Sequence, residues 1–587
     1  MSHPSDREPL LDGERVERHY DGRDTSSDTH YRQELGAAPV WKPNVPHTGL
    51  RRDLSIRQVS MIAIGGTIGT GLFLGTGRSL AQGGPASILI CYGIVGFIVY
   101  ITVSLLGELA TQYPVAGSFT VYTARFFSPS YAFALSWNYW FNDAVSVASD
   151  LTAAQLVLQF WTDWHPWVIS VVFLAFLLGV NALSVRSYGE MEYILSSLKV
   201  FTVVLFIIVG ALVNAGVNRQ HTPIGTRYWH IPGAPFVGGI AGFARVFVTA
   251  SFAYGGTESL AITAGETKNP TKNMPRIVRV VFWRILLFYI FSILIIGLNV
   301  PYDYPNLSNR STTTSPFTIV FREAGSNVAA SFMNTVILTS VLSAGNHALY
   351  AGTRILYSLS TSSPALAPRF FSQTTSHGVP LRALIGTSSI SALCLASSFV
   401  GSGELWGWLQ NIVGVSNQIA WLSIGIASWR FRKAWIAQSR SLSEMKFRAN
   451  WTWPWGAPFV VFSVSLIILF QGWTSLYPAF SFIDFVSLYL ELPVMAIMTF
   501  AWYFIRHRRE IVHSHHPIGS DAGPGYRTLQ SVIASKHTSR EVVDVNTVDL
   551  YADEHMDDEH DVEDDALHVA RRKGRWGWFW RLYDIMA

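Results

Sequence analysis

The feature that most constrains this chain is a series of apolar blocks, each about 20 residues long, that recur between Ile56 and Ile505. A helix of about 20 apolar residues spans the hydrocarbon core of a bilayer. Of the 587 residues, 49% are hydrophobic and 14% are charged, whereas a soluble domain carries roughly 25% charged residues. A soluble chain of this length would instead divide into domains joined by polar linkers. The pattern therefore predicts an all-α polytopic membrane protein.

The apolar blocks give about twelve predicted transmembrane helices. In order, they cover 57–79, 86–111, 130–160, 166–184, 192–214, 240–262, 280–300, 326–360, 383–401, 405–429, 456–477 and 483–505. We expect a transmembrane domain over 51–505, flanked by an N-terminal tail (1–50) and a C-terminal tail (506–587). Both tails are polar and short of aliphatic residues, which predicts disorder.

The charges of the connecting loops predict the orientation in the membrane. With the N-terminus inside, the inner loops hold about fourteen Lys and Arg residues and the outer loops about five, as the positive-inside rule requires. An even number of spans then places both tails in the cytosol. No apolar signal peptide is visible in the first 50 residues, so the first span is expected to act as its own insertion signal. Two glycosylation sequons, at Asn306 and Asn309, fall in a predicted outer loop.

Several classes of function find no support in the sequence. The two cysteines, Cys91 and Cys394, both lie in apolar spans, and neither a disulfide framework nor a CxxC spacing exists. We find no nucleophile–base set and no cluster of metal ligands, so we predict that the protein is not an enzyme and needs neither cofactor nor metal. The net charge of +4 is small, and we predict no nucleic-acid partner.

The first span contains an unusual density of glycine. Four glycines stand among the seven residues Gly65–Gly71, and each weakens a helix by roughly 1 kcal/mol relative to Ala. One interpretation is close helix packing, because Gly65/Gly69 and Gly71/Gly75 form GxxxG pairs. The other is a discontinuous helix whose freed N–H groups hold an anionic group at the middle of the membrane. The order of the glycines does not fit a Rossmann loop.

A second glycine-interrupted stretch lies five spans later, in the sequence FAYGGTE from Phe252 to Glu258. Interruptions in corresponding helices of two halves are the best sequence indication of a transporter site. Freed carbonyls at this second break would suit an ammonium group. One break offers donors and the other offers acceptors, as a zwitterion requires.

The motifs along the chain resemble those of the fungal, yeast-type amino-acid permeases, which belong to the amino acid–polyamine–organocation superfamily. The resemblance covers about residues 50–505 and is carried by SMIAIGGTIGTGLF (60–73), GELA (107–110), the stretch from Pro114 to Tyr122, WNYW (137–140), ITAGETKNP (262–270), VFWR (281–284) and LTSVLSAGN (338–346). It implies a leucine-transporter-like core of two inverted repeats, about 57–214 and 240–429, with two accessory helices at about 456–505. It also implies amino-acid import across the plasma membrane by alternating access and proton symport. The vacuolar or endosomal membrane is the alternative location.

The same resemblance implies where the substrate binds. The backbone at the first break would bind the substrate carboxylate, and the backbone at the second would bind the α-amino group. The implied residues are Thr67, Ile68, Gly69, Thr70 and Gly71 at the first break, and Phe252, Ala253, Tyr254 and Gly255 at the second. Phe252 stands where related antiporters place an aromatic gate, although it could also be an ordinary core aromatic residue.

Charged side chains inside predicted spans are functional candidates, because burying a charge in lipid is costly. They are Glu108, Asp143, Asp150, Lys199, Arg245 and Glu258. In relatives, a lysine at the position of Lys199 bridges the first and fifth spans where sodium-coupled members hold sodium. Lys199, Glu258 and Glu108 are therefore candidates for proton coupling, and the alternative for Lys199 is a fixed tether between helices.

Three positions depart from the pattern of the family. Asp150 replaces the usual Glu, Asp143 replaces an apolar or aromatic residue, and His347 stands where relatives have a small residue. The two aspartates are seven residues apart, so they lie nearly on one helix face. An acidic cavity would favour Lys or Arg as substrate over Asp or Glu. Alternatively, one aspartate could sit in water near a span end, and His347 could be a hydrogen-bonded core residue.

Two rival functions and several partners follow from the same features. The chain could be an amino-acid sensor on the same fold, or a carrier of another small amine such as a polyamine or carnitine. The run from Asp6 to Leu11 fits an acidic dileucine sorting signal, and trafficking and ubiquitin-ligase adaptors are candidate partners of the tails. Basic and aromatic residues from Arg571 to Arg581 predict a segment that binds membrane lipid at the inner leaflet.

Overall fold

The computed structural model describes residues 68–115, 117–183, 185–259, 278–305, 307, 314–362, 365–375, 378–476, 480–515 and 541–551. Within these ranges the regular structure is helical and no strand occurs. Thr67, the two sequon asparagines, the dileucine-like run and the basic aromatic run all lie outside the described residues.

Helices occupy most of the predicted apolar blocks. They are η2 (Gly71–Gly75), α3 (Thr76–Gln112), α4 (Ser118–Phe126), α5 (Pro129–Leu158), α6 (Pro166–Leu183), α7 (Val185–Asn214), η3 (Arg227–Trp229), α8 (Gly239–Tyr254), η4 (Ile285–Ile290), α11 (Phe291–Asn299), α12 (Pro316–Glu323), α13 (Asn327–Thr361), η5 (Arg369–Ser372), α14 (Leu381–Ser391), η6 (Ala392–Ala396), α15 (Ser397–Val400), α16 (Ser402–Ala437), η7 (Leu442–Glu444), η8 (Asn450–Thr452), α17 (Gly456–Phe470), α18 (Trp473–Leu476), α19 (Phe482–Tyr489) and α20 (Glu491–His515).

Six helical stretches in the described part are long and apolar enough to cross a membrane. They are Gly71–Gln112, Gly189–Asn214, Val278–Asn299, Asn327–Thr361, Leu381–Val400 and Ser402–Ala437. The pair α19 and α20 gives a seventh if its 47° bend is counted as one span. Shorter apolar helices cover Pro166–Ala182, Gly239–Tyr254 and Gly456–Phe470. The fold is thus that of a polytopic helical membrane protein, and the count of twelve spans stays a prediction.

The first two predicted spans meet without a long loop, because the chain bends sharply at Gly84. This residue has φ +81°, in the left-handed region that favours glycine. A Cβ there would lie only 2.5 Å from the carbonyl oxygen of Pro235. Pro85 follows, and the N–H of Ala86 donates to that same Pro235 oxygen at 3.2 Å. The bend therefore depends on a close approach of the connection before α8.

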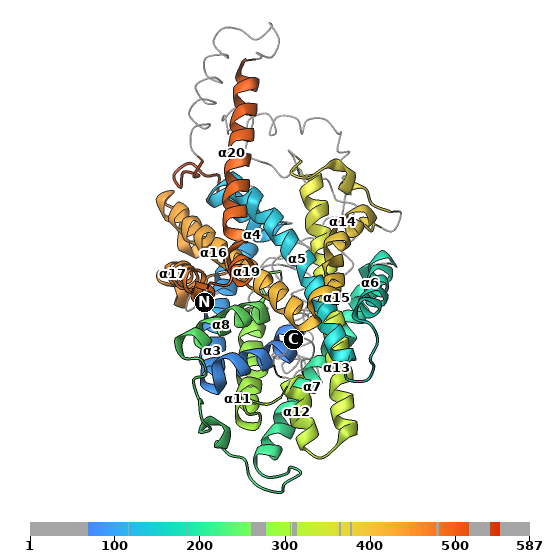
Figure 1. Cartoon of the computed structure of the whole chain (residues 1–587). Coiled ribbons are helices and arrows are strands. Elements are labelled where there is room, and N and C mark those ends of the chain that lie inside the picture. The colour runs from blue at the N-terminus through green and yellow to red at the C-terminus, as the bar shows by residue number, and fades with distance from the viewer. Residues whose placement is uncertain are drawn as a thin grey trace, which may run out of the picture.

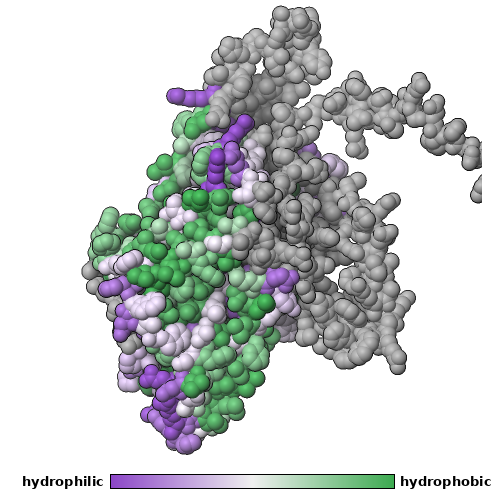
Figure 2. Space-filling view, turned by 90° about the vertical axis from the view of Figure 1, so that its right-hand side faces the viewer, coloured by the Kyte–Doolittle hydropathy of each residue, from purple (hydrophilic) through white to green (hydrophobic). Residues whose placement is uncertain are grey.

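The bundle is centred on α5, which packs most extensively against α13 and α16, while α3 packs along α8 (Figure 1). Figure 2 shows a broad apolar surface on the visible face, with polar residues gathered towards its two ends. Large hydrophobic side chains such as Phe176, Phe201 and Phe462 are exposed. An apolar exterior around a polar interior is the arrangement that a lipid environment favours, and it places the buried charges between helices.

Candidate functional site

The interruption predicted in the sixth span is present. Helix α8 ends at Tyr254, and Gly255 leaves the helical conformation with ψ 154°. Gly256 has φ +79°, which a residue with a side chain rarely adopts. A Cβ on Gly255 would lie 2.0 Å from Nδ2 of Asn417 on α16. The two glycines therefore serve different needs: one allows α16 to approach closely and the other allows the turn.

Glu258 holds the chain after this break against two neighbouring helices. Its carboxylate accepts hydrogen bonds from the hydroxyl of Tyr139 on α5 at 2.9 Å and from the indole N–H of Trp421 on α16 at 3.0 Å. The backbone N–H of Gly256 donates to it as well, at 3.2 Å. Glu258 is fully buried. Three donors bind this carboxylate, so Glu258 holds the chain after the break in place against α5 and α16.

The helix of the first span starts at the glycine run. The chain becomes helical at Thr70 and opens with the π-helical turn η2. Phe73 N–H bonds to the carbonyl of Gly69 at 3.2 Å. The N–H groups of the first helical residues lack acceptors within the helix, so this end presents donors. The discontinuous-helix interpretation requires such an end, and Thr67 lies outside the described residues.

The start of the first-span helix touches the end of α8 and the middle of α13. A Cβ on Gly71 would lie 2.4 Å from Cα of Ala253 in α8. A Cβ on Gly69 would lie 2.7 Å from Cβ of Ala344 in α13. Glycine is needed at both positions for close packing, so close packing and a helix start occur together here. The two interpretations of the glycine run are not exclusive.

The carbonyl groups at the second break already have partners within the protein. The oxygen of Ala253 accepts from the hydroxyl of Tyr289 at 2.7 Å. The oxygen of Tyr254 accepts from Thr257 Oγ1 at 2.6 Å, and that of Phe252 accepts from Gly255 N–H at 3.1 Å. A carbonyl oxygen has two lone pairs, so each can accept one further donor. These three carbonyls are thus already bonded within the protein, and their binding of a substrate ammonium group stays a prediction.

Asp150 on α5 connects the first break to α13. Its carboxylate accepts a short hydrogen bond from Thr70 Oγ1, and its Cβ lies 3.3 Å from where Gly345 of α13 would carry a Cβ. Asp143, two turns earlier, contacts Gly352 of α13 in the same way at 3.0 Å. Its Oδ2 has no hydrogen-bond partner among the described residues. The two aspartates face one helix, as their spacing predicts.

Lys199 lies in a polar chain between α7 and α13. Its ammonium donates to Ser343 Oγ at 2.9 Å, and Ser343 donates in turn to Glu192 at 2.8 Å. Asn346 also donates to Glu192, at 3.2 Å, and accepts from Asn181 at 2.7 Å. Lys199 is 1% exposed and Glu192 is 0% exposed. A buried cation thus has a buried anion on its own helix, linked through one serine.

Glu192 is not among the predicted buried charges, and it stands at the first residue of the predicted fifth span. A signal was available, since residues 192 and 199 are seven apart and therefore share a helix face. Arg245 is the opposite case. The sequence predicts that Arg245 is a buried charge within a span. Its side chain is exposed, so that prediction is wrong.

His347 and Phe252 both lie near the second break. His347, half-buried on α13, has its Nε2 3.3 Å from the hydroxyl of Ser259. That hydroxyl also donates to the carbonyl of Gly256 at 2.6 Å. Phe252 is half-buried and packs on a cluster that includes Val413 of α16. A half-buried ring at a helix break suits a gate and a core position equally.

Glu108 belongs to a different part of the molecule. It forms a buried ion pair with Arg432 of α16, and the N–H of Ala449 donates to it at 2.7 Å. The ring of Trp453 lies 5.2 Å from the Arg432 guanidinium. The contacts that join the breaks to Asp150, Glu258 and His347 do not include Glu108. In the described ranges, no cluster of three or more His, Cys, Asp or Glu side chains has the arrangement of a metal site.

A helical bundle with an apolar exterior, a helix start and a helix break in contact, and buried charges around them is the arrangement of a membrane transport protein. The chain belongs to the amino acid permease family, whose model matches residues 58–513. It is 44% identical over 491 residues to a protein of Schizosaccharomyces pombe named as a probable amino-acid permease, covering 80% of this chain and 95% of the relative.

Two other relatives differ in the substrate that their names give. The lysine-specific permease LysP of Escherichia coli is 43% identical over 463 residues, with 78% of this chain and 94% of the relative covered. The general amino-acid permease GAP2 of Candida albicans is 39% identical over 455 residues, with 76% and 77% covered. These relatives are permeases and not enzymes.

Proposed function

We propose that this protein imports amino acids across the plasma membrane by proton symport, with alternating access. The proposal includes the twelve-span fold, with both tails in the cytosol and inverted repeats at about 57–214 and 240–429. One observation carries it: the start of the first-span helix and the end of α8 meet, with Gly71 packed on Ala253. Contact between two interrupted helices creates one site that faces both.

The substrate backbone would bind between these two breaks. The N–H groups of Thr67 to Gly71 would hold the carboxylate, which the positive end of a helix dipole favours. The carbonyls of Phe252 to Gly255 would accept from the α-amino group with their second lone pairs. Phe252 would cover the substrate as a gate.

The side-chain pocket would favour cationic amino acids. Asp150 and Asp143 are both buried and both face α13, and Asp143 has an oxygen without a hydrogen-bond partner in the described ranges. An acidic substrate would bring a like charge next to them, at a cost of several kcal/mol. The name of the lysine-specific relative supports the same preference. His347 would line the opposite side of this pocket.

Proton coupling would run through Lys199. The amine interacts electrostatically with Glu192 and with Asp150, and Asp150 bonds to Thr70 at the first break. A proton that leaves Lys199 would therefore change the charge balance next to the substrate carboxylate site. Glu258 is the second candidate for this role, and Glu108 ranks last because its charge is already balanced by Arg432.

Radiolabelled uptake in permease-deficient yeast, with every proteinogenic amino acid as competitor, tests this function. We expect concentrative uptake that unlabelled Lys and Arg compete for most strongly. Signalling with negligible flux would instead indicate a sensor. Competition by polyamines or carnitine, with no effect of α-amino acids, would indicate an amine carrier.

A further inference from the structure

A segment of the C-terminal tail, residues 541–551, lies against the helical bundle. It follows α20 in the chain, and its contacts are with Arg506 of α20, with the end of α3, with α4 and α5, and with α16 and the chain after it. In Figure 1 it is the short red coil near α20. Its sequence, EVVDVNTVDLY, contains three acidic residues and no Lys or Arg. We call this stretch the docked tail segment.

One end of the docked tail segment pairs with the corner between α4 and α5. Val543 N–H donates to the carbonyl of Phe127 at 2.9 Å. The guanidinium of Arg430, on α16, donates to the carbonyls of both Phe126 and Val543. One arginine therefore ties the end of α4, the tail and α16 together.

The carboxylate of Glu541 caps the start of α5. It accepts from the hydroxyl of Ser128 at 2.5 Å and from the N–H of Ser130 at 3.0 Å. Arg506 of α20 lies 3.9 Å away. An anion at a helix N-terminus is stabilised by the helix dipole, so this residue is held by a helix end, a hydroxyl and a cation.

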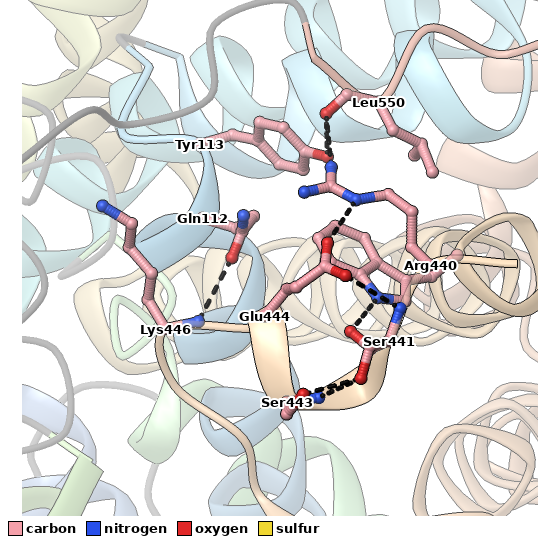
Figure 3. A network of polar contacts seen from close by, with 9 residues as sticks. Gln112, Tyr113, Arg440, Ser441, Ser443, Glu444, Lys446 and Leu550 are labelled. Atoms are coloured by element: carbon pink, nitrogen blue, oxygen red, sulfur yellow. Dashed lines mark hydrogen bonds and ion pairs between the residues drawn. The ribbon is translucent and has the colours of Figure 1, made fainter. Parts of the chain in front are cut away.

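The other end of the segment is buried against α3, α4 and the end of α16. Leu550 is 0% exposed. Its carbonyl accepts from Tyr113 at 2.8 Å and from Arg440 at 3.5 Å, as Figure 3 shows. Arg125 of α4 donates to the carbonyl of Asp549 at 2.6 Å, and Gln438 donates to those of Val545 and Val548 at 3.2 and 2.7 Å.

The charges of the two surfaces are complementary. The face that receives the tail presents four arginines to a segment with three acids and no bases: Arg125, Arg430, Arg440 and Arg506. Most of these bonds go to backbone carbonyls at the two ends of the segment, and a turn lies between them, in which the N–H groups of Thr547 and Val548 donate to the carbonyl of Asp544. A face whose guanidinium groups bind the carbonyls of Val543, Asp549 and Leu550, and which buries the Leu550 side chain, is a peptide-docking surface.

We propose that this arginine-lined face is a docking surface for an acidic peptide, occupied by the chain's own residues 541–551, and that docking restrains transport. The segment joins the α4–α5 corner to the end of α16. Alternating access requires some helices to move against others, and a segment that ties α4, α5 and α16 together opposes any movement among these three helices. The restraint on transport rests on the proposed function, whereas the docking does not.

Docking is tested by a disulfide across the Phe127–Val543 contact. Phe127→Cys and Val543→Cys are combined with Cys91→Ala and Cys394→Ala, and a protease site is inserted between residues 516 and 540. Under mild oxidation we expect the cleaved tail to stay attached until a reductant is added. Leu550→Asp should abolish this cross-link. The matched control is Val542→Asp, because Val542 is 47% exposed and its change should leave the cross-link intact.

Restraint is tested on the same proteins by two readouts. Oxidation of the cysteine pair should cause a loss of [³H]lysine and [³H]leucine uptake that reductant reverses, and Leu550→Asp should raise the initial rate above that of Val542→Asp. Hydrogen–deuterium exchange of residues 118–130 and 430–440 should be faster in Leu550→Asp. Hydrogen–deuterium exchange reports on the restraint even if neither amino acid is transported. Absence of transport would contradict the proposed function but not the docking.

Two results would overturn the inference. Equal, low cross-linking in the parent and in both tail variants would show that the segment does not dock. Efficient cross-linking with unchanged uptake and unchanged exchange would show that docking restrains nothing.

Discussion

Two buried glutamates in this protein accept three described hydrogen bonds each, from very different donors. Glu108 faces the guanidinium of Arg432, which donates twice, and one backbone N–H. Glu258 accepts from a tyrosine hydroxyl, an indole N–H and a backbone N–H. The first carboxylate is balanced by a permanent cation, whereas the described donors to the second are neutral.

This difference indicates which region can change its charge during a transport cycle. Protonation of Glu108 would leave Arg432 as an uncompensated buried cation, which is strongly unfavourable. Protonation of Glu258 breaks no ion pair with its hydrogen-bond donors, and its cation, buried Arg284, interacts with it electrostatically without a described hydrogen bond between them. We therefore interpret the Glu108 region as a fixed structural joint between α3 and α16, and the region of the helix breaks as the one that responds to substrate and protons.

The largest expected effect is a loss of folding stability when the Glu108–Arg432 ion pair is broken. Arg432→Met leaves Glu108 as a buried charge without its cation, which costs about 3–5 kcal/mol. We expect little folded protein, measured by size-exclusion chromatography and thermal melting in detergent. Glu108→Gln/Arg432→Met should recover much of the loss, and Glu258→Gln should remain folded. Wild-type melting of Arg432→Met would contradict the distinction between the two regions.

Lys199→Met should abolish concentrative uptake but leave substrate exchange measurable, because the site between the breaks keeps its backbone groups. Counterflow in proteoliposomes measures exchange, and uptake with and without a protonophore measures accumulation. If Lys199→Met still accumulates substrate, and the protonophore still abolishes that accumulation, another residue carries the proton. Glu258 would then be the next candidate.

Asp150→Asn should weaken uptake of arginine more than uptake of leucine. The amide oxygen can still accept the hydrogen bond from Thr70, so the change removes charge and keeps the contact. Thr70→Val is the matched variant, because it removes the donor and keeps the charge. Competition curves for both substrates measure the ratio, and equal losses for arginine and leucine would assign Asp150 to the transport cycle instead.

Gly69→Ala should lower uptake moderately, since its Cβ would lie 2.7 Å from that of Ala344. Adding Ala344→Gly removes the clash and should restore uptake. A loss on Gly69 substitution alone therefore does not identify a carboxylate site, because packing explains it. Failure of the double variant to recover, at equal surface expression, would instead favour a direct effect at the backbone site.

Local sequence patterns predicted the features that depend on local physics. Helices cover most of the apolar blocks, and the glycines of the FAYGGTE stretch marked the end of α8 within the span. The spacing of Asp143 and Asp150 predicted that they share a face. Each of these depends on helix length, backbone freedom or helical periodicity, which a single sequence records.

Features that depend on distant partners could not be predicted in the same way. Arg432 lies just beyond the predicted span 405–429 and therefore falls among the inner-loop charges, although it pairs with a residue 324 positions away. The polar composition of the C-terminal tail predicts disorder. The sequence of residues 541–551 does not indicate that arginines from distant helices bind this segment. The sharp bend at Gly84 depends on Pro235, which belongs to another connection. Such contacts are set by tertiary packing, and no local sequence pattern predicts them.

The most direct test of the central claim is proton-driven accumulation by the purified protein in proteoliposomes. With [³H]lysine outside and an inwardly directed proton gradient imposed, we predict accumulation above the equilibrium level and its collapse when a protonophore is added. Uptake that only reaches equilibrium, and that is the same with and without the gradient, would contradict proton symport.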